Sequence, residues 1–91
     1  MCVLSAKLVF YISHANSLKD KRQVSRSLIQ KARQRYNVAI AEVDTQDIHR
    51  TLSLGITVIS SDQFHAQRSL DEVIRFMELN EAAELREVEA F

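Results

Sequence analysis

Cysteine, glycine, proline and tryptophan are almost absent from this chain of 91 residues, which has one cysteine, one glycine and neither of the other two. Because Cys2 is alone, an internal disulfide and a zinc site built on several cysteines are both excluded. The single glycine, Gly55, cannot supply a glycine-rich phosphate loop, and without proline there is no sign of a flexible linker. We therefore expect one domain over residues 1–91 and no cofactor.

Long apolar runs are also missing. No stretch approaches the roughly 20 apolar residues that a membrane-spanning helix needs. The N-terminus lacks the basic segment followed by an apolar core that marks a signal peptide. These absences predict a cytoplasmic protein with no membrane partner.

The chain does contain many charges, and they are divided between two segments although the formal net charge is +0. Residues 19–35 contain one acid, Asp20, and residues 71–91 contain two basic residues, Arg75 and Arg86. This layout indicates an anionic partner at the basic pole, or a self-complementary assembly. The basic residues of the first segment are Lys19, Lys21, Arg22, Arg26, Lys31, Arg33 and Arg35; the acids of the second are Asp71, Glu72, Glu78, Glu81, Glu84, Glu87 and Glu89.

Hydrophobic periodicity predicts six elements. Alternation with a period of two marks strands, and apolar stripes at helical spacing mark helices. Their order, β-α-β-β-α-β with right-handed crossovers, predicts a ferredoxin-like α+β fold, in which a four-stranded antiparallel sheet carries two helices on one face. The expected strands are 2–12, 38–44, 49–60 and, more weakly, 85–91; the expected helices are 17–36 and 60–79.

The ends of the first helix have recognisable signals. Ser17 and Asp20 have the spacing of a capping box, and Asn37 is expected to end the helix as a residue that tolerates positive φ. The apolar faces of the six elements should then meet in one core. Its expected members are Leu4, Leu8, Phe10, Leu28, Ala32, Leu54, Ile56, Leu70, Ile74 and Met77.

Three segments stand out together: SLKDKR at 17–22, NVAIAEVD at 37–44 and LGITVISSD at 54–62. In this order and spacing they resemble the YlxP-like family of small bacterial proteins of unknown function, over essentially the whole chain. The resemblance implies a ferredoxin-like fold and a bacterial cytoplasmic protein. Genes of that family often lie beside those for translation initiation and ribosome-binding factors, so it also implies RNA or the ribosome as partner. His49 departs from the family pattern, which often has a large aromatic residue there.

The basic helix is the first candidate site. Lys19, Arg22, Arg26 and Arg33 share one flank, and the cations of the first turn, Lys21 among them, oppose the helix dipole while free amides there favour an anion. We interpret these five residues as contacts to the phosphates of a nucleic-acid backbone. The alternative is a solvated helix face whose long side chains cover the core edge. Lys21 falls inside the apolar stripe, so it should either extend its amine to water or pair with a carboxylate.

The sheet face without helices is the second candidate. Val9, Tyr11, Gly55, Thr57 and Ile59 make it more apolar than a solvated face, and we predict that they form a homodimer interface whose closest approach is at Gly55. The alternatives are pairing of the second strand with its copy, or scattered half-exposed residues. Because Tyr11 is the only outward aromatic residue, base stacking on the sheet is not expected.

Catalytic patterns are weak. Glu42, Asp44, Asp47 and His49 could bind a divalent metal, but they fit an ordinary polar turn better. We therefore expect no enzymatic activity and no metal. The chain is predicted to be a homodimeric binding protein that contacts RNA or a ribonucleoprotein through its basic helix. The alternative is a subunit that docks on an acidic protein, with the acidic end of a sister chain as one such surface.

Overall fold

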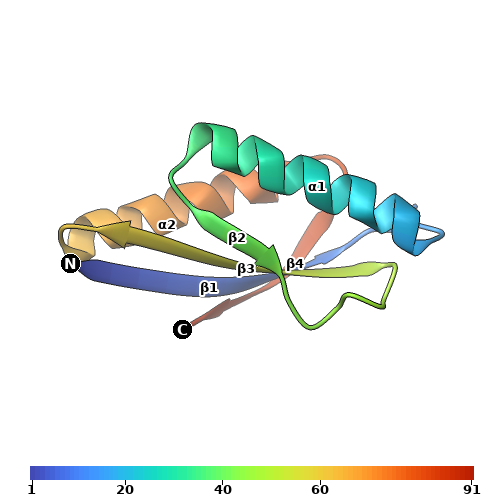
Figure 1. Ribbon diagram of the computed structural model, residues 1–91, viewed down its shortest axis with the longest axis horizontal. Helices are drawn as coiled ribbons and strands as arrows, with labels where there is room; N and C mark the ends of the chain where they lie inside the picture. Colours follow the sequence, from blue (N-terminus) through green and yellow to red (C-terminus); the bar gives the residue numbers. More distant parts are fainter.

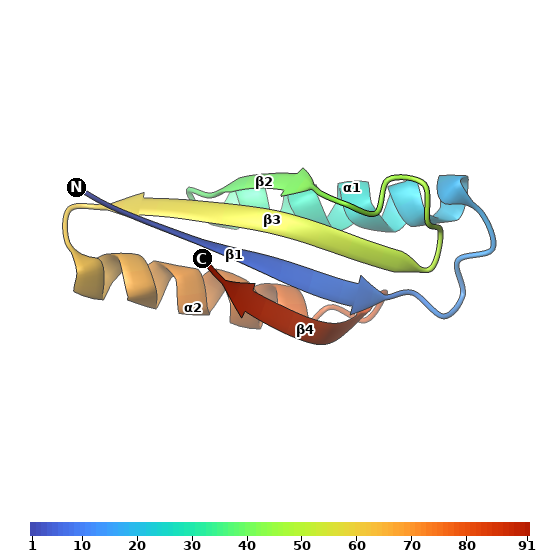
Figure 2. The ribbon, with the colours of Figure 1, turned by 90° about the horizontal axis from the view of Figure 1, so that it is seen from below.

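A computed structural model describes residues 1–91 and contains the six elements in the predicted order (Figure 1). They are β1 (Cys2–Tyr11), α1 (Leu18–Arg35), β2 (Ala39–Glu42), β3 (Thr51–Ser60), α2 (Gln63–Glu78) and β4 (Glu84–Ala90). The strands form one antiparallel sheet in the order β2-β3-β1-β4. Both helices lie behind one face of this sheet, and the other face is open (Figure 2). The ferredoxin-like α+β prediction is thus confirmed.

The core is built on the two central strands. β1 and β3 pair along their whole length, from Cys2 opposite Ser60 to Tyr11 opposite Thr51. Alternate side chains of each strand point at the helices and are buried, as period-two alternation requires. No member of the predicted core is exposed, although Leu4 and Ile74 are only partly buried. The buried apolar residues of the central strands are Ala6, Leu8, Phe10, Leu52, Leu54, Ile56 and Val58, and Ile12, directly after β1, is buried with them.

The N-terminus of α1 is capped by the residues that the sequence indicated. Ser17 Oγ accepts from the Asp20 backbone N–H at 3.1 Å, and Asp20 Oδ2 accepts from the Asn16 backbone N–H at 3.0 Å. The carboxylate therefore reaches one residue further back than in a standard capping box. The buried face of α1 is half polar, because Lys21 and Ser25 are buried together with Leu28 and Ala32.

The end of α1 differs from the expectation. Asn37 does not have positive φ; the helix ends at Arg35, and Tyr36 is already extended with φ −130°. The extended backbone is favoured because the Tyr36 ring packs edge-to-face on Phe76 of α2, with ring centroids 5.5 Å apart. Asp44, after β2, is the one non-glycine residue with positive φ. Neither helix combines the length and the apolar character needed to cross a membrane.

Candidate functional site

The outer flank of α1, on the side of the edge strand β2, carries the predicted basic residues. Arg22, Arg26 and Arg33 are exposed and line a groove of about 390 Å³ together with Ser25, Ile29 and Gln30. No acidic residue lines this groove, and none of its arginines forms an ion pair with a carboxylate. The charges of this flank are therefore left free for an external anion.

Arg33 is the most constrained member of the flank. Its Nη2 donates to the Ile40 carbonyl at 2.9 Å, so the guanidinium is fixed against β2 while its other donors stay free. The bond also occupies part of the sheet edge that a second copy of β2 would need for pairing.

Lys21 does not belong to this surface. Its side chain is 1% exposed, and Nζ lies 2.7 Å from Glu42 Oε2, whose side chain is 17% exposed. The same amine donates to the carbonyls of Thr45 and Thr51. The inclusion of Lys21 among the anion-binding residues was wrong, because an ammonium group buried on three acceptors cannot also bind a phosphate. The alternative expectation for this residue, pairing with a carboxylate, is confirmed.

The buried pair organises the connection between β2 and β3. Thr45 Oγ1 donates to Glu42 Oε2 at 3.1 Å and accepts from the Ser53 backbone N–H at 2.9 Å. Asp44, with φ of 65°, turns the chain so that Thr45 can reach both partners. No buried side-chain polar atom lacks a hydrogen-bond partner. The network therefore fixes this connection beneath the first half of α1.

The charge division of the sequence becomes a division across the sheet. α1 lies behind β2 and β3, whereas β4, at the opposite edge, carries Glu84, Glu87 and Glu89, all exposed (Figure 2). A molecule with no net charge thus has a basic side and an acidic side. Such a dipole orients the protein in the field of a charged partner.

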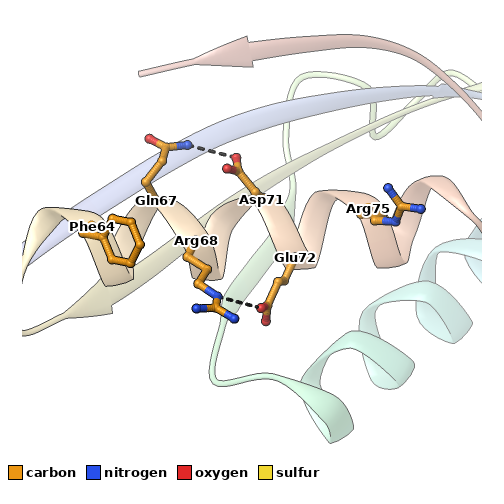
Figure 3. A pocket seen from close by; sticks show the side chains of 6 residues that line it. All are labelled: Phe64, Gln67, Arg68, Asp71, Glu72 and Arg75. Carbon is orange, nitrogen blue, oxygen red and sulfur yellow. Dashed lines mark hydrogen bonds and ion pairs between the residues drawn. The ribbon is translucent and has the colours of Figure 1, made fainter.

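The outer surface of α2 provides an internal comparison. Gln67 Nε2 donates to Asp71 Oδ1 at 3.0 Å, and Arg68 Nε lies 3.5 Å from Glu72 Oε1 (Figure 3). Such pairs between side chains four residues apart, here one ion pair and one amide–carboxylate hydrogen bond, are common on solvated helices. The exposed surface of α1 has no such pair.

Sequence reasoning missed a row of neutral side chains on α1. Gln23, Ser27, Gln30 and Gln34 are exposed, and the intervals of four, three and four residues place them in one stripe. None of them makes a side-chain hydrogen bond within the protein, in contrast to Gln67 of α2. Their helical spacing could have revealed this stripe from the sequence, but the seven cations of the same segment are the more conspicuous pattern.

The open sheet face is less uniform than predicted. Ile59 is 52% exposed and stands opposite Val3, which is 50% exposed. The other predicted interface residues are partly covered by their own chain. The Arg86 guanidinium lies 4.6 Å from the centre of the Tyr11 ring, and the Thr57 hydroxyl is hydrogen-bonded to that of Ser5 at 2.8 Å.

The other two predicted interface residues, Val9 and Gly55, are also only partly exposed. A Cβ added to Gly55 would lie 3.4 Å from Val43 Cγ1. This is an ordinary van der Waals distance, so a methyl group at this position would pack on Val43 without displacing it.

Lys7 links three elements across this face. Its Nζ lies 3.2 Å from Asp44 Oδ2 and 3.6 Å from Glu89 Oε2, so it joins β1 to the β2–β3 connection and to β4. The hydrogen bond to Asp44 raises the pKa of Lys7 above its ordinary value, although desolvation opposes this effect. The ammonium group is therefore held charged between two carboxylates.

The carboxylates near this connection do not converge. Glu42 points at Lys21 and Asp44 at Lys7, and no group of three or more His, Cys, Asp or Glu side chains is placed to hold a metal ion. Asp47 and His49 are exposed in the connection. Of the residues considered as metal ligands, Glu42 and Asp44 thus pair with lysines, whereas Asp47 and His49 are exposed.

Comparison with known proteins agrees with this description. The model of a family described as "Protein of unknown function (DUF503)" matches residues 3–90. The chain is also 33% identical over 67 residues to the "Uncharacterized protein YlxP" of Bacillus subtilis (strain 168), a match that covers 74% of this chain and 73% of that protein. The chain therefore belongs to the DUF503 family, which includes YlxP-like proteins.

Proposed function

We propose that this protein is a non-enzymatic, cytoplasmic RNA-binding protein whose basic flank on α1, formed by Lys19, Arg22, Arg26 and Arg33, contacts the phosphate backbone. The observation that carries the proposal is the absence of any carboxylate partner for these four exposed cations. Phosphates neutralised by Lys and Arg release counterions, which drives binding without regard to sequence.

The position of the cations also favours a ligand. Lys19 and Arg22 lie near the N-terminus of α1, where positive charge opposes the helix dipole and lowers stability. A position that costs stability in the free protein is consistent with selection for binding. RNA is preferred among polyanions because the resemblance to the YlxP-like family implies RNA or the ribosome as partner.

A sister chain is a poorer partner for the basic flank. The flank lies on the β2 side of the sheet and the acids of β4 lie on the opposite edge. A contact in which each copy used only one of these two patches would be head-to-tail, which closes into a ring or grows into a filament. An unrelated acidic protein is the second candidate, and the salt dependence of binding distinguishes it.

Dimerisation through the open face is a separate part of the proposal. Val3 and Ile59 form a half-exposed apolar pair on that face, next to the exposed Ala39 and Ala41 of β2. A two-fold axis over this area would bury the same apolar patch of both copies. The acids of β4 would stay at the rim, where charge is tolerated.

The test is RNA binding by fluorescence anisotropy at several salt concentrations. We expect the wild type to bind total ribosomal RNA, with a log–log salt slope of about −2.8 for four contacts on single strands or about −3.6 on a duplex, by analogy with DNA. The double reversal Arg22→Glu/Arg26→Glu should abolish binding while the circular dichroism spectrum and melting temperature are kept, because both side chains are exposed.

The matched control reverses the charge of two arginines on α2, Arg68→Glu/Arg75→Glu. It changes the net charge by the same amount, so equal loss of binding in both variants would indicate a global charge effect. Failure of wild-type protein to bind RNA would refute the proposal. Binding of an acidic protein with a shallow salt slope would favour the second candidate.

A further inference from the structure

We infer that the outer face of α1 binds helical RNA by lying along its minor groove, with the stripe Gln23, Ser27, Gln30 and Gln34 toward the groove. The inference rests on the proposed function and names the form of RNA that the site accepts. Cations stand on both sides of this stripe. Lys19, Arg22, Arg26 and Arg33 line one side, and Lys31 and Arg35 line the other.

The two rows of cations fit two phosphate strands. A single strand laid on the outer flank would not reach Lys31 and Arg35, which lie on the α2 side of the helix. Lys31 lines the groove between the two helices, and the Arg35 guanidinium is held 5.3 Å from the centre of the Phe76 ring. A duplex presents phosphates on both sides of a groove, so it matches both rows at once.

The neutral stripe suits the polar groups that a duplex displays between its two phosphate strands. Glutamine carries two donors and an acceptor, and serine a donor and acceptors, so each can bond a ribose 2′-hydroxyl or a base edge. The A-form minor groove is wide and shallow and displays these groups. From Gln23 to Gln34 the stripe is about 16 Å long, at 1.5 Å per residue.

The absence of aromatic side chains argues against unpaired RNA. Proteins that hold single strands stack bases on aromatic rings. α1 contains no aromatic residue, and Tyr36, which follows it, is turned onto Phe76. Tyr11 lies on the open sheet face beneath Arg86, away from the basic side.

The outer surface of α2 differs from that of α1. On α2 the Arg68–Glu72 ion pair and the Gln67–Asp71 hydrogen bond join neighbouring side chains, although Arg75 has no such partner (Figure 3). On α1 the glutamines have no partner, and the one acid of the helix, Asp20, is only partly exposed and caps the first turn. Two helices of one protein, in one layer, thus have differently composed outer faces.

The experiment compares four probes of the same sequence: an RNA duplex, each of its single strands, a DNA duplex and an RNA–DNA hybrid. We expect the RNA duplex to bind tightest. The triple variant Gln23→Ala/Gln30→Ala/Gln34→Ala should weaken RNA-duplex binding by at least about tenfold and reduce the preference over DNA, because it removes three hydrogen-bonding groups. Its salt slope should not change, since no cation is removed. Alanine favours helix, so the fold should be kept.

If all six cations contact phosphates, the log–log salt slope on the RNA duplex should be about −5.4, steeper than the slope of about −3.6 for the four flank contacts alone. A second variant, Lys31→Gln/Arg35→Gln, should return it to about −3.6 and leave the slope on single strands unchanged. The matched control is Gln67→Ala on α2, which should leave all affinities unchanged.

Equal affinity for single strands and the duplex would overturn this inference while the proposed function stands. So would a triple variant that keeps the wild-type preference. Tighter binding to the DNA duplex would indicate insertion into the major groove of DNA in place of the RNA minor groove. No binding to any probe would refute both the inference and the proposed function.

Discussion

Replacing Lys21 by methionine tests whether the buried ion pair holds the β2–β3 connection in place. Methionine keeps the length of the side chain but removes the ammonium group. Glu42, 17% exposed, would then lose the partner 2.7 Å away, and the carbonyls of Thr45 and Thr51 would each lose a donor. We expect a large loss of stability, because an uncompensated charge stays mostly buried.

The expected magnitude follows from the geometry. Two unit charges 2.7 Å apart at an effective dielectric constant of about 20 attract by about 6 kcal/mol. Desolvation of each ion offsets several kcal/mol of this, so the pair as a whole contributes little net stability. Removing one partner from a buried pair costs about 3 to 5 kcal/mol. Because Glu42 keeps some contact with water, the lower end, about 3 kcal/mol, is expected.

The assay is urea unfolding followed by circular dichroism. With an m-value of about 1.5 kcal/mol/M, a loss of about 3 kcal/mol lowers the midpoint by about 2 M. The double variant Lys21→Met/Glu42→Leu should recover part of this loss, because it removes the orphaned charge. Lys31→Met, at an exposed position of the same helix, is the control and should change stability by no more than about 0.5 kcal/mol. A Lys21→Met protein as stable as this control, or a double variant less stable than Lys21→Met, would refute the reasoning.

Three further outcomes are expected. Phe10→Ala should destabilise the protein by about 3 to 5 kcal/mol in the same assay, since Phe10 is fully buried between sheet and helices; a loss below about 1 kcal/mol would contradict this. The bond from the His65 backbone N–H lowers the pKa of Asp62 below 3.8, so this carboxylate stabilises the fold above that pH and its contribution is lost as the pH falls through the lowered value. Asp62→Asn should therefore melt at a lower temperature than the wild type at pH 6, and the two melting temperatures should converge in strong acid. Sedimentation equilibrium at micromolar concentration should give a dimer for the wild type and a monomer for Ile59→Asp, whereas a wild-type monomer would remove the dimer from the proposal.

The fold could be predicted because its signals are local and repeated. The alternation of Leu8 and Phe10 in β1, and of Leu54 and Ile56 in β3, determines which face of each strand is buried, and the β-α-β-β-α-β order leaves few topologies. The end of α1 could not be read in the same way. Whether Asn37 takes positive φ depends on where the Tyr36 ring packs, which is a contact with a helix 40 residues further along the chain.

The basic flank could also be predicted from local spacing, with the exception of Lys21. Helical spacing places Arg22, Arg26 and Arg33 on one side without any tertiary information. Lys21 was misplaced because its environment depends on Glu42 and Thr45, which approach it only once β2 and its connection have folded beneath α1. Charge alone does not distinguish a ligand-binding lysine from one that holds the interior together.

The buried Lys21–Glu42 pair also affects how the exposed cations of α1 are presented to a ligand. Lys21 ties the first half of the helix to the β2–β3 connection, and Arg33 ties the second half to Ile40 at the sheet edge. These two bonds fix the helix in rotation and in position, so the cations between them, Arg22 and Arg26, are presented at fixed places. A rigid array loses little entropy when it binds, which favours association with a regular polyanion. Loss of either tie should therefore weaken binding even where the protein stays folded. Arg33→Lys, which keeps the charge but not the planar guanidinium, separates this positioning effect from simple loss of charge.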